Sequence, residues 1–184
     1  MGIDGKMLLE LINNRQSDRK YSDRKVEKDK IERIIEAGRL APSACNAQPW
    51  KLIAVDDPEI LRQLAIAASE KLLGMNAFVS QAPFLFVIVR EAPNFKSRIG
   101  STVKDKDYSL IDIGIAAENI CLQAEAEGLG SCIIGWFDEK MVRKILGIPT
   151  LKRVELIITI GYSLSDKRIK RRKDTNEIVS FNKY

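Results

Sequence analysis

Hydrophobic residues occur along this chain in short runs of strand length. The segments "APFLFVIVR" and "SCIIGWF" are almost continuously apolar, which is typical of strands buried on both faces. No run is long enough to cross a bilayer, so we expect no membrane partner. The pattern predicts four strands, at residues 50–56, 82–90, 131–137 and 153–163.

Between these runs, apolar residues recur every three or four positions, which is the period of an amphipathic helix. One helix carries its own start signal, because Asp57 can cap it and Pro58 suits its first turn. The pattern predicts helices at residues 7–13, 27–40, 56–73, 108–127 and 138–149. Strands interleaved with helices indicate one α+β or α/β domain over residues 1–184.

Two segments lack this periodicity. Residues 91–107 are polar and form a long loop or small lid, and loops of this length are often functional. The tail from about residue 164 is basic and irregular, with a predicted extended segment at "EIVSF". Because the tail has no core of its own, we expect it to pack on a partner subunit.

Composition removes several kinds of chemistry. The 184 residues include no histidine, which excludes Ser-His-Asp and Cys-His catalysis and any histidine-bound metal. The three cysteines are odd in number and widely spaced, which argues against a disulfide framework and a zinc site. The N-terminus does not resemble a signal peptide, so a cytoplasmic location is expected.

The net charge of +5 is concentrated near the two ends, in "NNRQSDRKYSDRK" and "SDKRIKRRK". Arg15, Ser17 and Arg19 alternate, and two guanidinium groups with a hydroxyl suit a phosphate monoester. Lys170 and Arg172 alternate in the same way. A solvated, solubilising surface is the alternative interpretation of both clusters.

The segment "LAPSACNAQPW" carries two amide side chains, Asn46 and Gln48, at alternate positions. If the segment is extended, both amides point the same way and suit the edge of a heteroaromatic ring. The alternative is a loop that joins a helix to a strand. Cys45 lies between the amides and is expected to be a small buried residue.

Glycines flank the apolar run in "GLGSCIIGWFD". Gly128, Gly130 and Gly135 would let a flat ligand or another backbone approach closely, or they serve packing alone. The segment lacks the strand–GxGxxG–helix context of a dinucleotide fold, and the chain contains no P-loop motif.

In their order and spacing, "RQSDRKY", "APSACNAQPWKLIAV", "DIGIAAENICLQAEAEGLGSCIIGWFD" and the basic "KRRK" resemble the FMN-dependent nitroreductase family. The resemblance covers about residues 10–173. It implies a three-layer α/β/α fold of the α+β class, with a central mixed, mostly antiparallel sheet. It also implies a homodimer that holds FMN at its interface and exchanges its C-terminal tails.

The resemblance further implies which residues bind FMN. The first motif holds the phosphate and one ring edge, the amide segment reaches the flavin of the partner chain, and a strand end lies beside the reactive nitrogen. Gln16 departs from the Arg or His that the family often has there, and any of residues 170–173 can point inward. The implied set is Arg15, Gln16, Ser17, Arg19, Pro42, Ser43, Ala44, Asn46, Gln48, Ile133, Ile134, Gly135, Lys170 and Arg172.

The implied activity is hydride transfer from NAD(P)H through FMN to a small electrophile such as a nitroaromatic or a quinone. The flavin carries the chemistry, so no side chain is expected to be catalytic and no metal is expected. Two alternatives remain within the same scaffold: a dehalogenase-like member that uses residues 91–107 as its lid, and a protein that stores or senses flavin. A basic nucleic-acid-binding module is a third alternative, but only Tyr21 and Tyr184 are aromatic near the basic ends, so no nucleic-acid partner is expected.

Overall fold

The computed structural model describes residues 4–69, 75–92 and 107–184. Its centre is a four-stranded sheet in the order β1-β2-β4-β3, in which every neighbouring pair is antiparallel. Within those ranges, parallel pairing is limited to an isolated bridge between Ser17 and Ser131. The strands are β1 (Trp50–Val55), β2 (Phe84–Arg90), β3 (Gly130–Ile134) and β4 (Arg153–Gly161). All four predicted strands are confirmed, although β3 ends three residues before the predicted boundary.

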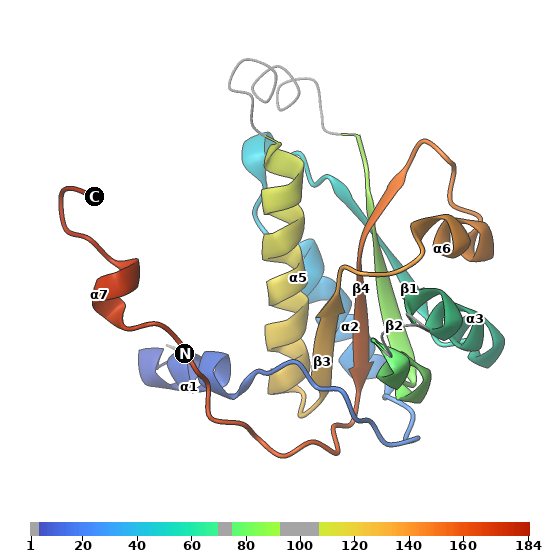
Figure 1. Ribbon diagram of the computed structural model, residues 1–184, viewed down its shortest axis with the longest axis horizontal. Coiled ribbons are helices and arrows are strands. Elements are labelled where there is room, and N and C mark those ends of the chain that lie inside the picture. The colour runs from blue at the N-terminus through green and yellow to red at the C-terminus, as the bar shows by residue number, and fades with distance from the viewer. Residues whose placement is uncertain (1–3, 70–74, 93–106) are drawn as a thin grey trace.

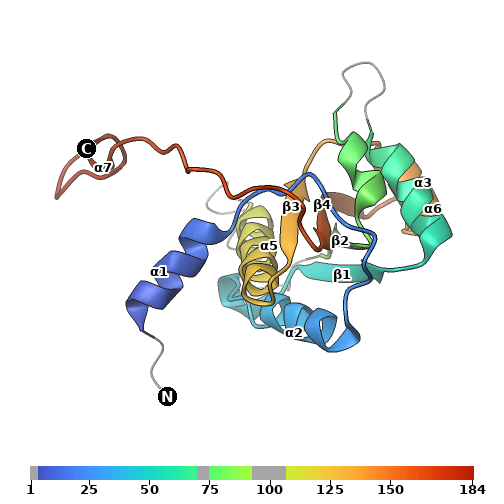
Figure 2. The ribbon, with the colours of Figure 1, turned by 90° about the horizontal axis from the view of Figure 1, so that it is seen from below.

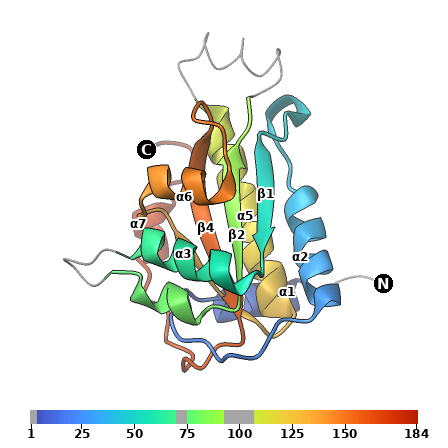
Figure 3. The same cartoon turned by 90° about the vertical axis from the view of Figure 1, so that its right-hand side faces the viewer.

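Helices cover both faces of the sheet. On one face lie α2 (Lys28–Arg39) and α5 (Tyr108–Ala126), and on the other lie α3 (Pro58–Ala68) and α6 (Glu139–Leu146), as Figures 1 and 3 show. The predicted α+β class and three-layer arrangement are therefore confirmed. None of the helices described is both long and apolar enough to cross a membrane.

Strand β2 explains how the two hydrophobic cores share one sheet. Leu85, Val87 and Val89 belong to the core beneath α3 and α6. Phe84, Phe86 and Ile88 belong to the core beneath α2 and α5. Because alternate residues of a strand point to opposite faces, a strand between two helical layers must be apolar throughout.

The signals predicted for α3 are present. The Asp57 side chain accepts hydrogen bonds from the backbone N–H groups of Glu59 and Ile60, and Pro58 is the first helical residue. The helix ends at Ala68, and residues 70–73 of the predicted helix lie outside the described residues. The predicted lid also lies mostly outside them, at residues 93–106.

The two ends of the chain leave the three layers. Helix α1 (Gly5–Asn14) lies beside the lower end of α5, and the C-terminal tail runs past it to α7 (Thr175–Ile178), as Figures 1 and 2 show. The prediction of an extended "EIVSF" segment was wrong at its start. Asp174 and Glu177 form a capping box that turns the chain into this short helix.

Candidate functional site: a pocket lined by cations

The N-terminal segment after α1 and the C-terminal tail after β4 lie side by side. Tyr21 forms a β-bridge with Ser163, and the Leu164 N–H donates to the Lys20 carbonyl at 2.9 Å. The N-terminal segment is also tied to β3, because the Asp18 N–H donates to the Ser131 carbonyl at 2.9 Å. Two segments that are far apart in sequence thus meet at the edge of the sheet. For example, the Gln16 side chain donates to the carbonyl of Asp166, which is 150 residues further along the chain.

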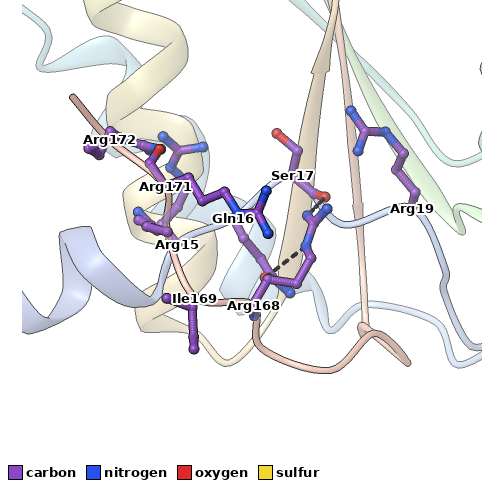
Figure 4. Close-up of a pocket in the computed structure, with 9 residues that line it drawn as sticks. Arg15, Gln16, Ser17, Arg19, Arg168, Ile169, Arg171 and Arg172 are labelled. Atoms are coloured by element: carbon purple, nitrogen blue, oxygen red, sulfur yellow. Dashed lines mark hydrogen bonds between the residues drawn. The ribbon is translucent and has the colours of Figure 1, made fainter.

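A cavity of about 690 Å³ opens between these two segments, as Figure 4 shows. Its described lining contains six cationic side chains and no acidic one. It brings together the predicted first motif and both predicted tail residues. The lining consists of Arg15, Gln16, Ser17, Arg19, Arg168, Ile169, Lys170, Arg171 and Arg172.

The charged form of Lys170 is disfavoured by its surroundings in the cavity. The pKa of Lys170 is lowered, first by burial and then by the positive charges of Arg15 and Arg172. Its ammonium group donates to the Ile12 carbonyl at 2.5 Å. Arg15 has one partial counter-charge, because its Nε lies 3.2 Å from Glu118 Oε1. An anion in the cavity would relieve the remaining repulsion.

Arg168 lines the cavity but is missing from the predicted set. Its Nη2 donates to the Ser17 carbonyl at 2.6 Å, and its backbone N–H donates to Gln16 Oε1 at 3.1 Å. A signal for it exists in the sequence. The alternation of Lys170 and Arg172, extended by one step toward the N-terminus, reaches Arg168.

The segment that carries the two amides, which we call the amide loop (residues 43–48), is not extended as predicted. Cys45, Asn46 and Gln48 have left-handed backbones, with φ of 51°, 52° and 46°. The chain folds into a short 3₁₀ turn, η1 (Ala44–Asn46), and the two amides meet for that reason instead. Gln48 Nε2 donates to Asn46 Oδ1 at 3.1 Å.

Two side chains fix the shape of the amide loop. The Ser43 hydroxyl accepts from the Gln48 N–H at 2.9 Å. The buried carboxylate of Asp112, on α5, accepts from the Ala44 N–H, with both oxygens at 3.2 Å. Cys45 is exposed, so the expectation that it is buried was wrong. A left-handed turn in solvent directs its side chain away from the core.

The two isoleucines predicted to lie beside the flavin, Ile133 and Ile134, point to opposite faces at the end of β3. Ile134 is buried, whereas Ile133 is 37% exposed. Neither residue, nor Gly135, nor any residue from Pro42 to Gln48 belongs to the described lining of the cavity. The structure of one chain therefore joins the two basic groups of the predicted set and leaves the amide loop and the strand end apart from them.

Comparison with known proteins shows the family of this chain. Residues 12–162 match the model of the nitroreductase family. The chain belongs to that family. A protein of Archaeoglobus fulgidus, whose name proposes NADH dehydrogenase or NAD(P)H nitroreductase activity, is 34% identical over 163 residues. The match covers 86% of this chain and 87% of the relative.

Two solved structures extend the likeness to the fold. An FMN-dependent nitroreductase from Clostridium difficile R20291 is 33% identical and superposes with a TM-score of 0.78, covering 96% of this chain and 99% of its own. The NADPH:FMN oxidoreductase of Vibrio harveyi, solved with NAD⁺, is 26% identical with a TM-score of 0.79. That match covers 96% of this chain and 77% of the other. These structures confirm the predicted fold.

Proposed function

We propose that the cation-lined cavity holds the phosphate of FMN, and that the protein uses this flavin to reduce a small electrophile such as a nitroaromatic or a quinone. Membership of the nitroreductase family supports the general class directly: the chain is an NAD(P)H-dependent oxidoreductase that works with FMN. The particular acceptor and the residues that bind the flavin are the proposed part.

The composition of the cavity lining carries this proposal. FMN ends in a phosphate monoester with a charge of about −1.5 to −2 at neutral pH, as for other phosphomonoesters. The described lining offers six cations and the Ser17 hydroxyl, and no acidic side chain belongs to it. A guanidinium group can donate two parallel hydrogen bonds to two oxygens of one phosphate, so this set of donors fits the phosphate of FMN.

Each cation has a position that suggests its role. Arg15, Ser17 and Lys170 are all partly buried and all line the cavity. We therefore assign these three residues to the phosphate. Arg19 points away from the other cations in Figure 4, and its guanidinium carbon lies 6.0 Å from the centre of the Phe78 ring. We assign Arg19 to the ring edge, where a positive charge stabilises negative charge.

The protein's own contribution to the reaction is binding and electrostatics. When bound, FMN takes a hydride from NAD(P)H and passes electrons to the acceptor. The chain has no histidine to act as a proton donor, so the sources expected for the acceptor's protons are solvent, a carboxylate or the cofactor itself. The amide loop and the end of β3 supply polar backbone and side-chain groups that can hold a ring edge.

We further propose that the working unit is a homodimer in which the amide loop of one chain reaches the flavin of the other. Residues 164–172 of the tail pack on the N-terminal segment of their own chain, so the part of the tail that we expect to pack on the partner is its exposed end, residues 173–184. Helix α1 is amphipathic but has no buried residue, and all residues from 171 to 184 are exposed. Large apolar side chains remain exposed on α1, α5 and the tail, and exposed apolar groups in this number favour a partner that covers them. The apolar surface, as we define it, consists of Met7, Leu8, Leu9, Ile12, Leu110, Ile111, Ile115, Ile178, Val179 and Phe181.

The experiment that tests the flavin site compares FMN with riboflavin, which lacks the phosphate, in the wild-type protein and in Arg15→Gln. Loss of a charge-assisted hydrogen bond should weaken FMN binding by about 10- to 100-fold, and riboflavin binding should change little. Arg62→Gln, on α3 at the other face of the sheet, is the matched control. Equal losses for both ligands would contradict a phosphate role for Arg15.

A further inference from the structure

Gln16 lines the cavity, yet its side chain is occupied within the chain. Only 9% of the residue is exposed. Its Nε2 donates to Asp18 Oδ1 at 2.9 Å and to the Asp166 carbonyl at 3.1 Å. Both amide hydrogens are therefore in use, and Gln16 has no side-chain donor left for an anion.

The other end of the Gln16 amide faces the tail. Gln16 Oε1 accepts from the backbone N–H of Arg168 at 3.1 Å and from its Nε at 3.4 Å, as the dashed contact in Figure 4 marks. Arg168 in turn donates to the Ser17 carbonyl at 2.6 Å. These contacts fix where the tail crosses the N-terminal segment, and residues 170–172 enter the cavity just beyond this crossing.

The side chain of Asp18 holds the amide of Gln16 in place. Only 1% of Asp18 is exposed, and Oδ1 accepts from both Gln16 Nε2 and the Ser163 hydroxyl, the latter at 2.7 Å. Its position is confined by Gly130, since a Cβ atom there would lie 2.7 Å from Asp18 Oδ2. Asp18 is thus held to β3 by packing and by its own backbone N–H.

The charge of Asp18 does not favour an anion site. A buried carboxylate beside such a cavity repels a phosphate, and the repulsion is strong where little water screens it. Its place next to the cavity therefore needs another explanation. The contacts provide one, because Asp18 joins Gln16 of the N-terminal segment to Ser163 at the start of the tail.

We propose that Asp18 and Gln16 are positioning residues for the anion site. The buried carboxylate of Asp18 orients the amide of Gln16, and this amide holds Arg168, so that the cations of the tail face those of the N-terminal segment. Gln16 then acts on the phosphate through Arg168 and does not touch it. The inference rests on the proposed function, because the phosphate is that of FMN.

A double-mutant cycle tests the path from Gln16 to Arg168. Gln16→Met, Arg168→Met and the double variant are titrated with FMN and with riboflavin. We expect Gln16→Met to weaken FMN binding by about 10-fold, the effect of one well-placed hydrogen-bonded contact, with little change for riboflavin. In the Arg168→Met background, the backbone N–H of residue 168 can still donate to Gln16 Oε1, and only the contact of the guanidinium is lost. The same change should then cost about 3- to 5-fold, because coupled residues are not additive.

Gln63→Met is the matched control, since it makes the same replacement on α3. A change that only loosens the fold would weaken FMN and riboflavin alike, so the ratio of the two affinities separates positioning from general damage. Additive effects of Gln16→Met and Arg168→Met would overturn the inference while leaving the flavin site intact. A wild-type protein that binds no FMN would overturn the proposed function as well.

Asp18→Asn tests whether Asp18 orients Gln16, because the two possible roles of Asp18 change FMN binding in opposite directions. If Asp18 acts only through its charge, removing that charge should tighten FMN binding. If Asp18 orients Gln16, the weaker hydrogen bond to a neutral amide should loosen FMN binding by about 3-fold, since charge-assisted hydrogen bonds are roughly twice as strong as neutral ones. Tighter binding would overturn the positioning role of Asp18.

Discussion

Asp112 is a single buried carboxylate that sets the shape of the amide loop from a helix 68 residues away in sequence. Only 4% of the residue is exposed, and it accepts from the Ala44 N–H just where the chain enters its left-handed turn. Left-handed backbone is unfavourable for residues other than glycine, so the loop needs such contacts to persist.

Asp112→Ala should therefore destabilise the protein. The variant leaves the Ala44 N–H without its acceptor, and an unsatisfied polar group in a partly buried place costs about 1–3 kcal/mol. Urea denaturation of the wild type and the variant measures this difference in the free energy of unfolding. Asp29→Ala, at an exposed position on α2, is the control. Equal stability of Asp112→Ala and the wild type would show that the loop does not depend on this carboxylate.

Single residues also show where sequence reasoning reached its limit. The alternation of Arg15, Ser17 and Arg19 indicates an anion site, and the structure places all three at one cavity. The amides of Asn46 and Gln48 were expected to point the same way from an extended segment. They instead hydrogen-bond to each other across a left-handed turn, which local propensity does not predict. The exposure of Cys45 follows from that same turn. The role of Gln16 depends on partners about 150 residues away, which no local pattern records.

At the scale of elements, α2 is joined at its N-terminal end to the end of β4. Tyr162 donates its hydroxyl hydrogen to Glu27 Oε2 at 2.5 Å, and Arg24 Nη2 donates to Glu27 Oε1 at 2.5 Å. The hydrogen bond from Tyr162, then backbone and Arg24 contacts, lower the pKa of Glu27 from 4.5 to about 2. The carboxylate thus favours the folded state only while it is charged.

This linkage predicts a pH dependence with a definite sign. Because the folded pKa lies below the ordinary value of 4.5, the contribution of Glu27 is present above about pH 4.5 and is lost as the pH falls toward 2. The melting temperatures of the wild type and Glu27→Gln should differ at pH 7 and converge between pH 4.5 and 2. Glu32→Gln, further along α2, is the control. A difference that does not depend on pH would contradict the assignment.

The elements themselves were largely predictable for a physical reason. A strand covered on both faces must be apolar throughout, so β2 is evident from composition. A helix with a capping Asp and a first-turn Pro, such as α3, is evident from its start. Helix α7 was missed because four residues are too few to show a period. Its only signal is the capping box of Asp174 and Glu177.

At the scale of the whole molecule, the apolar surface is evidence for a second copy of the chain. Ile111 on α5 is 46% exposed, and Leu151, in the turn before β4, is 95% exposed, so neither side chain is needed for the core. Of the two, only Ile111 lies on the proposed interface. A single isolated apolar side chain on a surface carries no such meaning.

Ile111→Glu should therefore shift the protein from dimer toward monomer, because a buried charge without a partner opposes association. FMN binding should weaken in parallel if the flavin contacts both chains. Sedimentation velocity over a range of concentrations measures the assembly, and Leu151→Glu should leave it unchanged. A wild-type protein that sediments as a monomer at all concentrations would contradict the proposed dimer.

The central claim concerns bound flavin that accepts electrons from a nicotinamide. The most direct measurement is the visible absorption spectrum of the purified protein with FMN, recorded without oxygen before and after addition of NADH or NADPH. We expect a bound flavin spectrum that bleaches on addition of the reductant. Flavin that stays oxidised with both nicotinamides would contradict the enzymatic role and favour storage or sensing. Failure to bind FMN at all would contradict the account as a whole.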